Sequence, residues 1–154
     1  SGIPVKQPTK HPEMPLVYVV KGLLDTNYGR GPALDGWKVG HTTNLPLRMG
    51  QLSRDRGGLE LVALSHGTMA DELAAHRTLR SLRIPGGPTG CNLRAREWYR
   101  DCAQFRAWFD ALPAVWRGAV ACSAHSHGES GPTAAFLALV REVEAAVMAT
   151  RGAP

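Results

Sequence analysis

Short apolar runs, separated by polar and glycine-rich stretches, form the pattern of this chain. Residues 16–20 are an apolar run of β-type residues centred on Tyr18, and residues 37–39 form a shorter run. The stretch between them is rich in glycine, asparagine and aspartate, as loops are. We therefore expect these two runs to pair as a hairpin with a long tip, and residues 59–65 to form a third strand.

Apolar residues at helical spacing predict four helices. The first is capped by Thr43 or Asn44, has Pro46 in its first turn, and ends at the glycine pair 57–58. The other three are predicted over residues 69–83, from about 101 to 112, and over 133–150.

The predicted helix over residues 69–83 carries one apolar stripe. We expect the stripe to face the core. His76 lies within it, where a lone histidine is usually a hydrogen-bonded core residue. The members of the stripe are Met69, Leu73, Leu79 and Leu82.

The order of these elements, β-β-α-β-α-α with a further helix at the end, predicts an α+β fold. We expect a small antiparallel sheet of three strands flanked by helices. Residues 1–15 are expected to form an extended arm, residues 16–118 the domain, and residues 119–132 a linker. The amphipathic helix within residues 133–154 either docks on the domain or forms the face of a homodimer.

Composition narrows the class of protein. A hydrophobic content of 44% with 20% charged residues is typical of a globular chain. We recognise neither an apolar run long enough to span a membrane nor a signal peptide, so we expect a cytoplasmic protein without a membrane partner. The net charge of +5 favours a polyanionic partner such as nucleic acid.

Several residues in this frame carry chemistry, and each also has an ordinary structural explanation. Tyrosine is common at the middle of a strand, as at Tyr18, and lysine is common as a solvated residue near a strand end, as at Lys38. Arg48 falls on the apolar face of its helix and needs an acidic or phosphate partner there; Glu60 and Glu72 are the carboxylates that would satisfy it.

Their order along the chain is more informative than any single residue. A strand tyrosine is followed by Lys-Val-Gly, a helical arginine, a Glu-x-x-x-His pair, and Glu-Trp-Tyr after a glycine-rich loop. This order resembles the GIY-YIG nuclease superfamily, in particular its phage-type branch, where lysine replaces the second tyrosine. The residues are Tyr18, Lys38-Val39-Gly40, Arg48, Glu72, His76 and Glu97-Trp98-Tyr99.

The resemblance implies a DNA endonuclease that hydrolyses phosphodiester bonds with the help of a metal ion. By this analogy Tyr18 contacts the water or the scissile phosphate, and Lys38 acts as a base or phosphate contact. Arg48 holds the phosphate, and His76 is a helper or the general base. Glu97 is the metal ligand, for Mg²⁺ with Mn²⁺ as a substitute.

Further residues would contact the nucleic acid. Gly40 lets the backbone approach the substrate closely, and His41 follows it directly. Arginines are candidates for contacts to the DNA backbone, which would make binding depend strongly on salt. They are Arg54, Arg56, Arg94, Arg96 and Arg100.

Two alternatives stay open. Many family members have an asparagine after the glutamate, and this chain has none beyond Asn92, so a non-catalytic module that binds nucleic acid or protein is the alternative function. The second alternative is a zinc site that joins Cys122, His125 and His127 to one of the other two cysteines, Cys91 and Cys102, although its spacing matches no common structural zinc site. Three cysteines are too few for a disulfide framework.

Overall fold

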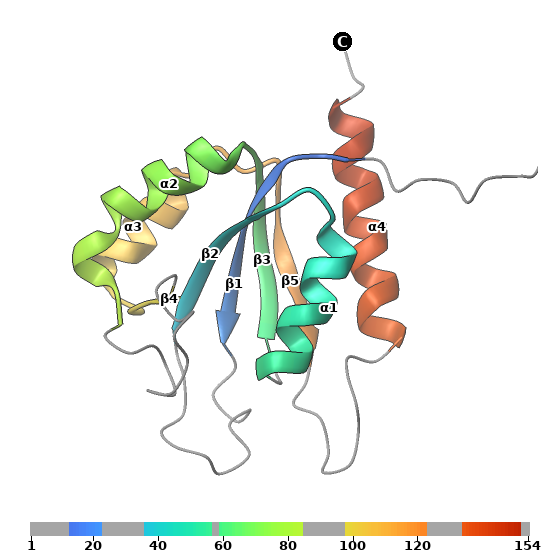
Figure 1. Cartoon of the computed structure of the whole chain (residues 1–154), viewed down its shortest axis with the longest axis horizontal. Helices are drawn as coiled ribbons and strands as arrows, with labels where there is room; N and C mark the ends of the chain where they lie inside the picture. The colour runs from blue at the N-terminus through green and yellow to red at the C-terminus, as the bar shows by residue number, and fades with distance from the viewer. Residues whose placement is uncertain (1–12, 23–35, 57–58, 85–97, 123–133, 152–154) are drawn as a thin grey trace, which may run out of the picture.

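A five-stranded antiparallel sheet forms the centre of the fold (Figure 1). The computed structural model describes residues 13–22, 36–56, 59–84, 98–122 and 134–151. The strands lie in the order β4-β2-β1-β3-β5. Their bounds are β1 Leu16–Gly22, β2 Trp37–Thr42, β3 Leu59–His66, β4 Trp98–Tyr99 and β5 Trp116–Cys122.

The fold is α+β, but the predicted sheet of three strands is wrong, since β4 and β5 were not anticipated. β4 has only two residues, which pair with the first two residues of β2. β5 pairs with β3, but only Val120 and Cys122 are buried in it. Neither strand therefore shows the apolar alternation that reveals a strand in a sequence. β5 also runs through residue 118, where we had expected the domain to end.

The central strand β1 divides the apolar residues between two cores. Successive side chains of a strand point to opposite faces of the sheet. Tyr18 and Val20 belong to a core on one face, whereas Val17 and Val19 belong to a core on the other. In register, Tyr18 lies opposite Gly40 of β2 and opposite Leu64 of β3. A residue paired with Tyr18 or Val20 therefore shares their face of the sheet.

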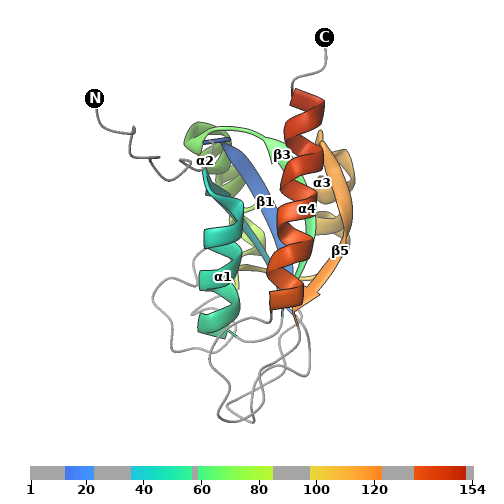
Figure 2. The ribbon, with the colours of Figure 1, turned by 90° about the vertical axis from the view of Figure 1, so that its right-hand side faces the viewer.

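Two pairs of helices cover these two faces (Figures 1 and 2). α1 Leu45–Arg56 and α4 Ala134–Arg151 contribute to the core that contains Tyr18. α3 Ala103–Ala111 and the region of α2 Met69–Thr78 pack on the opposite core. Asn44 is the cap of α1, because its side-chain oxygen accepts a hydrogen bond from the Leu47 backbone N–H at 3.2 Å.

The C-terminal helix α4 docks on the domain. Phe136, Val140 and Val147 are buried in the Tyr18 core, and the helix lies against α1 and β5. Docking was one of the two roles expected for this helix; its use as a dimer face stays a prediction. No helix in the described part of the chain, α4 included, has the length and apolar character needed to cross a membrane.

The apolar stripe predicted for the second helix does not face the core. Met69 is 62% exposed and Leu73 is 51% exposed, so both point toward solvent. α2 ends at Thr78, and a short 3₁₀ helix, η1 Arg80–Leu82, follows it. Of the residues in the expected stripe, Leu79 is the buried one. The partly buried positions of α2 are Glu72, Ala75 and His76, so the helix turns a different face toward the sheet from the one that carries Met69 and Leu73.

Candidate active site

Three of the five predicted catalytic residues lie on one face of the sheet. Tyr18 comes from β1, and Arg48 comes from α1, which covers this face. The Arg48 Nε–H donates a hydrogen bond to the Tyr18 hydroxyl at 3.0 Å. Lys38 of β2 is paired with Val20, so its side chain points to the same face. The hairpin and the following helix thus bring together residues that are 10 to 30 positions apart in sequence.

Gly40 is the residue that lets Tyr18 lie flat on β2. It stands directly opposite Tyr18 in the register of the two strands. A Cβ atom at position 40 would overlap the hydroxyl and ring of Tyr18, with Cε1 at 2.9 Å. The sequence predicts that this glycine lets the protein backbone approach the substrate closely. In the structure the tyrosine ring occupies that room, so Gly40 serves the position of Tyr18.

The three residues differ in how far they reach the surface. Tyr18 is 0% exposed and Lys38 is 3% exposed, whereas Arg48 is partly exposed. The outer end of Arg48 lies near Gln51, whose side-chain oxygen is 3.5 Å from Arg48 Nη1. Arg48 therefore connects the surface with the buried tyrosine. Of the three, it is the residue that a phosphate group can contact without displacing core side chains.

His76 lies on the opposite face of the sheet. Its ring sits between two partners: Nε2 is 3.2 Å from Glu72 Oε1, and Nδ1 contacts the Tyr99 hydroxyl. Tyr99 is fully buried and is paired with Trp37, a member of the core opposite Tyr18. The sheet therefore separates His76 from Tyr18 and Arg48. This arrangement matches the structural explanation, a hydrogen-bonded core histidine, and leaves the carboxylate of Glu72 paired with His76.

His41 also points away from the Tyr18 face. It is paired with Val17, whose side chain belongs to the opposite core. Its Nε2 atom is buried and has no hydrogen-bond partner among the described residues. A histidine in this position does not contact a ligand held by Arg48.

Several predicted residues lie outside the described part of the chain. Glu97, the expected metal ligand, is one of them, and so are Arg94, Arg96 and the side chains of Arg54 and Arg56. Arg100 is described and exposed directly after β4. Within the described residues, no group of three or more His, Cys, Asp or Glu side chains is arranged to hold a metal ion.

Some of the predicted zinc ligands lie within the described residues and others lie outside them. Cys91, His125 and His127 lie outside the described residues. Cys102 is a free thiol. Cys122 is buried in the Tyr18 core at the end of β5, whereas Cys102 packs against the opposite core before α3. The two described cysteines therefore belong to different faces of the sheet, and a site that used both would have to cross it.

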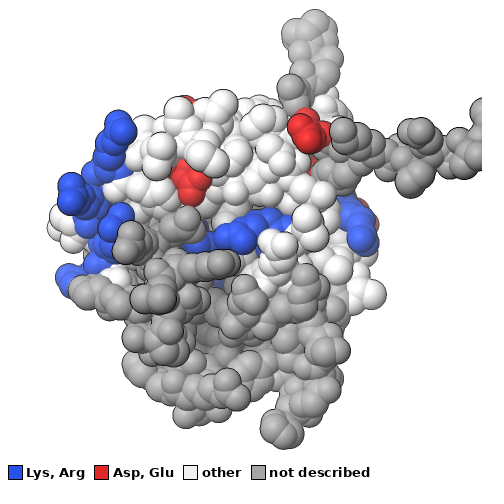
Figure 3. Space-filling model, viewed as in Figure 1, with Lys and Arg blue, Asp and Glu red and all other residues white. Residues whose placement is uncertain are grey.

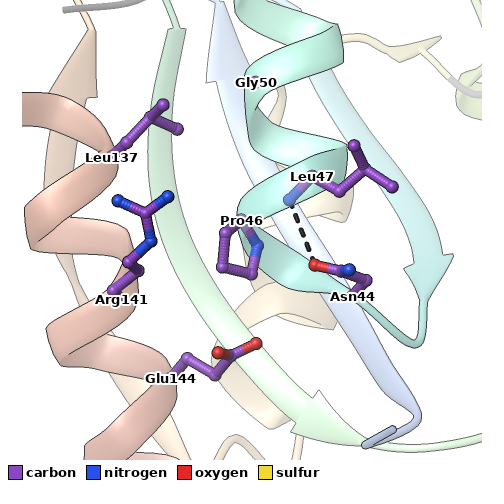
Figure 4. A pocket seen from close by; sticks show the side chains of 7 residues that line it. All are labelled: Asn44, Pro46, Leu47, Gly50, Leu137, Arg141 and Glu144. Atoms are coloured by element: carbon purple, nitrogen blue, oxygen red, sulfur yellow. Dashed lines mark hydrogen bonds between the residues drawn. The ribbon is translucent and has the colours of Figure 1, made fainter. Parts of the chain in front are cut away.

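A groove between α1 and α4 contains none of the predicted site residues (Figure 4). Its volume is about 370 Å³. Arg141 and the buried Glu144 of α4 give it one charge of each sign. Neither residue could be singled out from the sequence, because charged residues on an amphipathic helix are expected on its solvent side. The lining residues are Asn44, Pro46, Leu47, Gly50, Leu137, Arg141 and Glu144.

Charge is distributed unevenly over the side of the molecule seen in Figure 3. Lys and Arg side chains gather beside the C-terminal part of α2, and a second group lies at the centre of this view. Elsewhere, a cation is neutralised by a neighbour: Arg106 binds both oxygens of Asp101, at 2.8 and 3.0 Å. The hydrogen bonds from Arg106 hold the pKa of Asp101 below its usual range, and they raise the pKa of Arg106.

Comparisons of the chain with protein-family models, with curated proteins and with solved structures found no match. The resemblance to the GIY-YIG superfamily rests on the ordered residues of the sequence. The structure adds the common face of Tyr18, Lys38 and Arg48, and it removes His76 from that face. These placements are the basis of the functional argument.

Proposed function

We propose that this protein is a metal-dependent DNA endonuclease of the GIY-YIG type, in which Arg48 contacts the scissile phosphate. The main support for the proposal is the hydrogen bond from Arg48 Nε to the Tyr18 hydroxyl. Through this bond a buried tyrosine restrains the side chain of a partly exposed arginine. An isolated arginine loses much side-chain entropy when it binds a phosphate. An arginine held in advance loses less, so it is better suited to stabilising charge that develops in a transition state.

In this mechanism each residue has a distinct task. Arg48 binds non-bridging phosphate oxygens, a role that suits the planar guanidinium. Tyr18 is a positioning residue, because it is fully buried and acts through Arg48. Lys38 lies on the same face of the sheet as Tyr18 and would add a positive charge there. Trp98 is paired with Lys38 in the sheet, and Glu97, the expected metal ligand, directly precedes Trp98 in sequence.

The proposal assigns Mg²⁺ to Glu97, with Mn²⁺ as a substitute. A hard carboxylate with several waters is the usual environment of Mg²⁺ in such enzymes. When bound, the metal supplies Lewis-acid stabilisation of the phosphate and lowers the pKa of a coordinated water. A DNA substrate also fits the cytoplasmic location expected from the sequence.

The test is cleavage of supercoiled plasmid with Mg²⁺, with Mn²⁺ and with a chelator. The native chain is expected to nick the plasmid only when metal is present, and Glu97→Ala is expected to abolish nicking. Arg48→Lys keeps the charge but removes the Nε donor, so cleavage should fall by about 10²-fold to 10³-fold. Arg106→Gln is the matched control, because that arginine is exposed and already paired with Asp101.

The proposal would be refuted if the folded native chain cleaved no DNA with either metal. It would also be refuted if cleavage persisted unchanged in both Glu97→Ala and Arg48→Lys. Circular dichroism and thermal unfolding of each variant establish that lost cleavage is not lost folding. Tyr18→Phe keeps Arg48 but removes the hydroxyl that accepts its hydrogen bond. We expect this variant to lose less cleavage activity than Arg48→Lys.

A second function has an observation in its favour. Tyr18 and Lys38 are buried, and substrate cannot reach them in this conformation. A module that binds nucleic acid through Arg48 and uses Tyr18 only as a structural anchor would have this arrangement. Binding of DNA in the presence of chelator, combined with no cleavage under any metal condition, is the result that would select this function.

A further inference from the structure

Four arginines lie together beside the β4 edge of the sheet. Arg77 is in the last turn of α2, and Arg80 begins η1. Arg83 follows η1, and its backbone N–H donates to the Arg80 carbonyl at 3.4 Å. The Arg100 N–H donates to the Leu82 carbonyl at 2.9 Å, which brings the end of β4 alongside η1. Arg100 was expected from the sequence to contact the DNA backbone, whereas Arg77, Arg80 and Arg83 were not.

These charges are not neutralised by acidic neighbours within the described residues. The two ion pairs found there join His76 to Glu72 and Arg106 to Asp101. Arg83 has a buried Nε atom without a hydrogen-bond partner, which is a costly arrangement unless an acceptor arrives. Favourable placement at a helix C-terminus accounts for Arg77 in α2, but it does not account for Arg100, which directly follows β4.

We propose that Arg77, Arg80, Arg83 and Arg100 form a second contact surface for the phosphate backbone of nucleic acid, away from the phosphate held by Arg48. The inference rests on the proposed function for the identity of the polyanion. It extends that function by giving the substrate a required length, since one molecule must span both the arginine surface and Arg48. Figure 3 shows one group of basic side chains beside α2 and a second group at the centre of the same side of the molecule.

The surroundings of the arginine surface favour nucleic acid over an anionic membrane. Membrane-binding surfaces combine basic residues with large apolar side chains that insert between lipids. Of the exposed large apolar residues of the described chain, Met69 and Leu73 lie on α2, with Leu73 one helical turn before Arg77, whereas η1 and β4 carry none. Arg80, Arg83 and Arg100 therefore lie on segments without an exposed large apolar side chain, an arrangement that matches a regularly spaced row of phosphates.

The experiment measures binding of a short labelled DNA duplex by fluorescence anisotropy, in chelator and over a salt series from about 50 to 200 mM. The test variant is Arg77→Gln/Arg80→Gln/Arg100→Gln, whose three positions are exposed. Each phosphate contact adds about 0.9 to the slope of log affinity against log salt, so this slope should fall by about 2 to 3. A control variant, Arg106→Gln/Arg117→Gln/Arg141→Gln, removes the same charge elsewhere and should change the slope by less than about 1.

Equal effects in the test and control variants, or no effect in either, would overturn the inference. Vesicles rich in phosphatidylserine provide the competing partner: loss of vesicle binding with unchanged duplex binding would overturn the assignment to nucleic acid. This experiment can fail independently of the test of nuclease activity, because DNA binding is measured without metal. If the native protein binds duplex through this surface but never cleaves it, the inference is supported and the proposed nuclease activity is refuted. If the protein cleaves DNA and the test variant binds duplex as tightly as the native protein, the nuclease activity is supported and the inference is refuted.

Discussion

The contact between Gly40 and Tyr18 gives the sharpest test of the proposed site. The perturbation is Gly40→Ala, a single methyl group. The backbone at Gly40 does not have the positive φ that favours glycine, so alanine is acceptable there in conformation. The available space is the obstacle, because the added Cβ would overlap the Tyr18 ring and hydroxyl. Tyr18 is completely buried and cannot move outward without disturbing the core around it.

The magnitude follows from three contributions. Forcing a methyl group into a filled core costs about 1–3 kcal/mol. Displacement of the Tyr18 hydroxyl breaks its hydrogen bond from the charged Arg48, which is worth about 1.5–3 kcal/mol. Replacing glycine by alanine lowers the entropy of the unfolded chain and returns about 0.4–1 kcal/mol. We therefore expect Gly40→Ala to lower the free energy of unfolding by about 1.5–5.5 kcal/mol.

Urea unfolding of a double-mutant cycle isolates the contact. Tyr18→Leu removes the ring, so Gly40→Ala in that background should cost less than about 1 kcal/mol. Gly118→Ala is the control in the same sheet: its Cβ would meet Trp116 at 2.5 Å, but Trp116 is partly exposed and its indole can turn outward. A cost below about 0.5 kcal/mol for Gly40→Ala, or the same cost with and without the Tyr18 ring, would refute the reasoning.

Three other predictions concern the frame of the site. Phe136→Ala should lower the free energy of unfolding by about 3–5 kcal/mol in urea unfolding, because Phe136 is 2% exposed in the Tyr18 core. Tyr99→Phe removes the buried hydroxyl that contacts His76 and should cost about 1 kcal/mol in the same assay, while any cleavage activity stays close to native because the pair lies across the sheet. Asp101→Asn should lower the melting temperature most near neutral pH. The depressed pKa of Asp101 means that its stabilising contribution is present above the pKa of the unfolded carboxyl and is lost as the pH falls through the folded value, so the difference in melting temperature should shrink below about pH 4.

The strands with strong local patterns were predictable from the sequence. Residues 16–20 form a continuous β-branched and aromatic run, and the structure has β1 there. β5 was missed because Gly118 and Ala119 have weak β propensity and because Arg117, Gly118 and Ala119 are all exposed. An edge strand that buries little leaves little trace in the hydrophobic pattern.

The site was predictable to a similar extent. Helical spacing directed Arg48 toward the core. That Tyr18 and Lys38 share a face follows from the register of β1 and β2 and was not accessible from alternation within each strand. The position of His76 was not accessible, because its partner Tyr99 belongs to β4 and the pairing of β4 with β2 fixes the face of the sheet. The role of Gly40 as space for a tyrosine ring also depends on strand register, which local sequence does not specify.

The unequal strands of the sheet have a consequence for its dynamics. β1 is hydrogen-bonded to a neighbour on each side and buried on both faces, so its amide protons should exchange with solvent only through a large opening of the domain. β4 has two residues at the edge of the sheet, and its amides should exchange through small local openings. Tyr18 should therefore lie on the most slowly exchanging strand of the sheet, and its hydrogen bond with Arg48 should persist through local openings at the β4 edge.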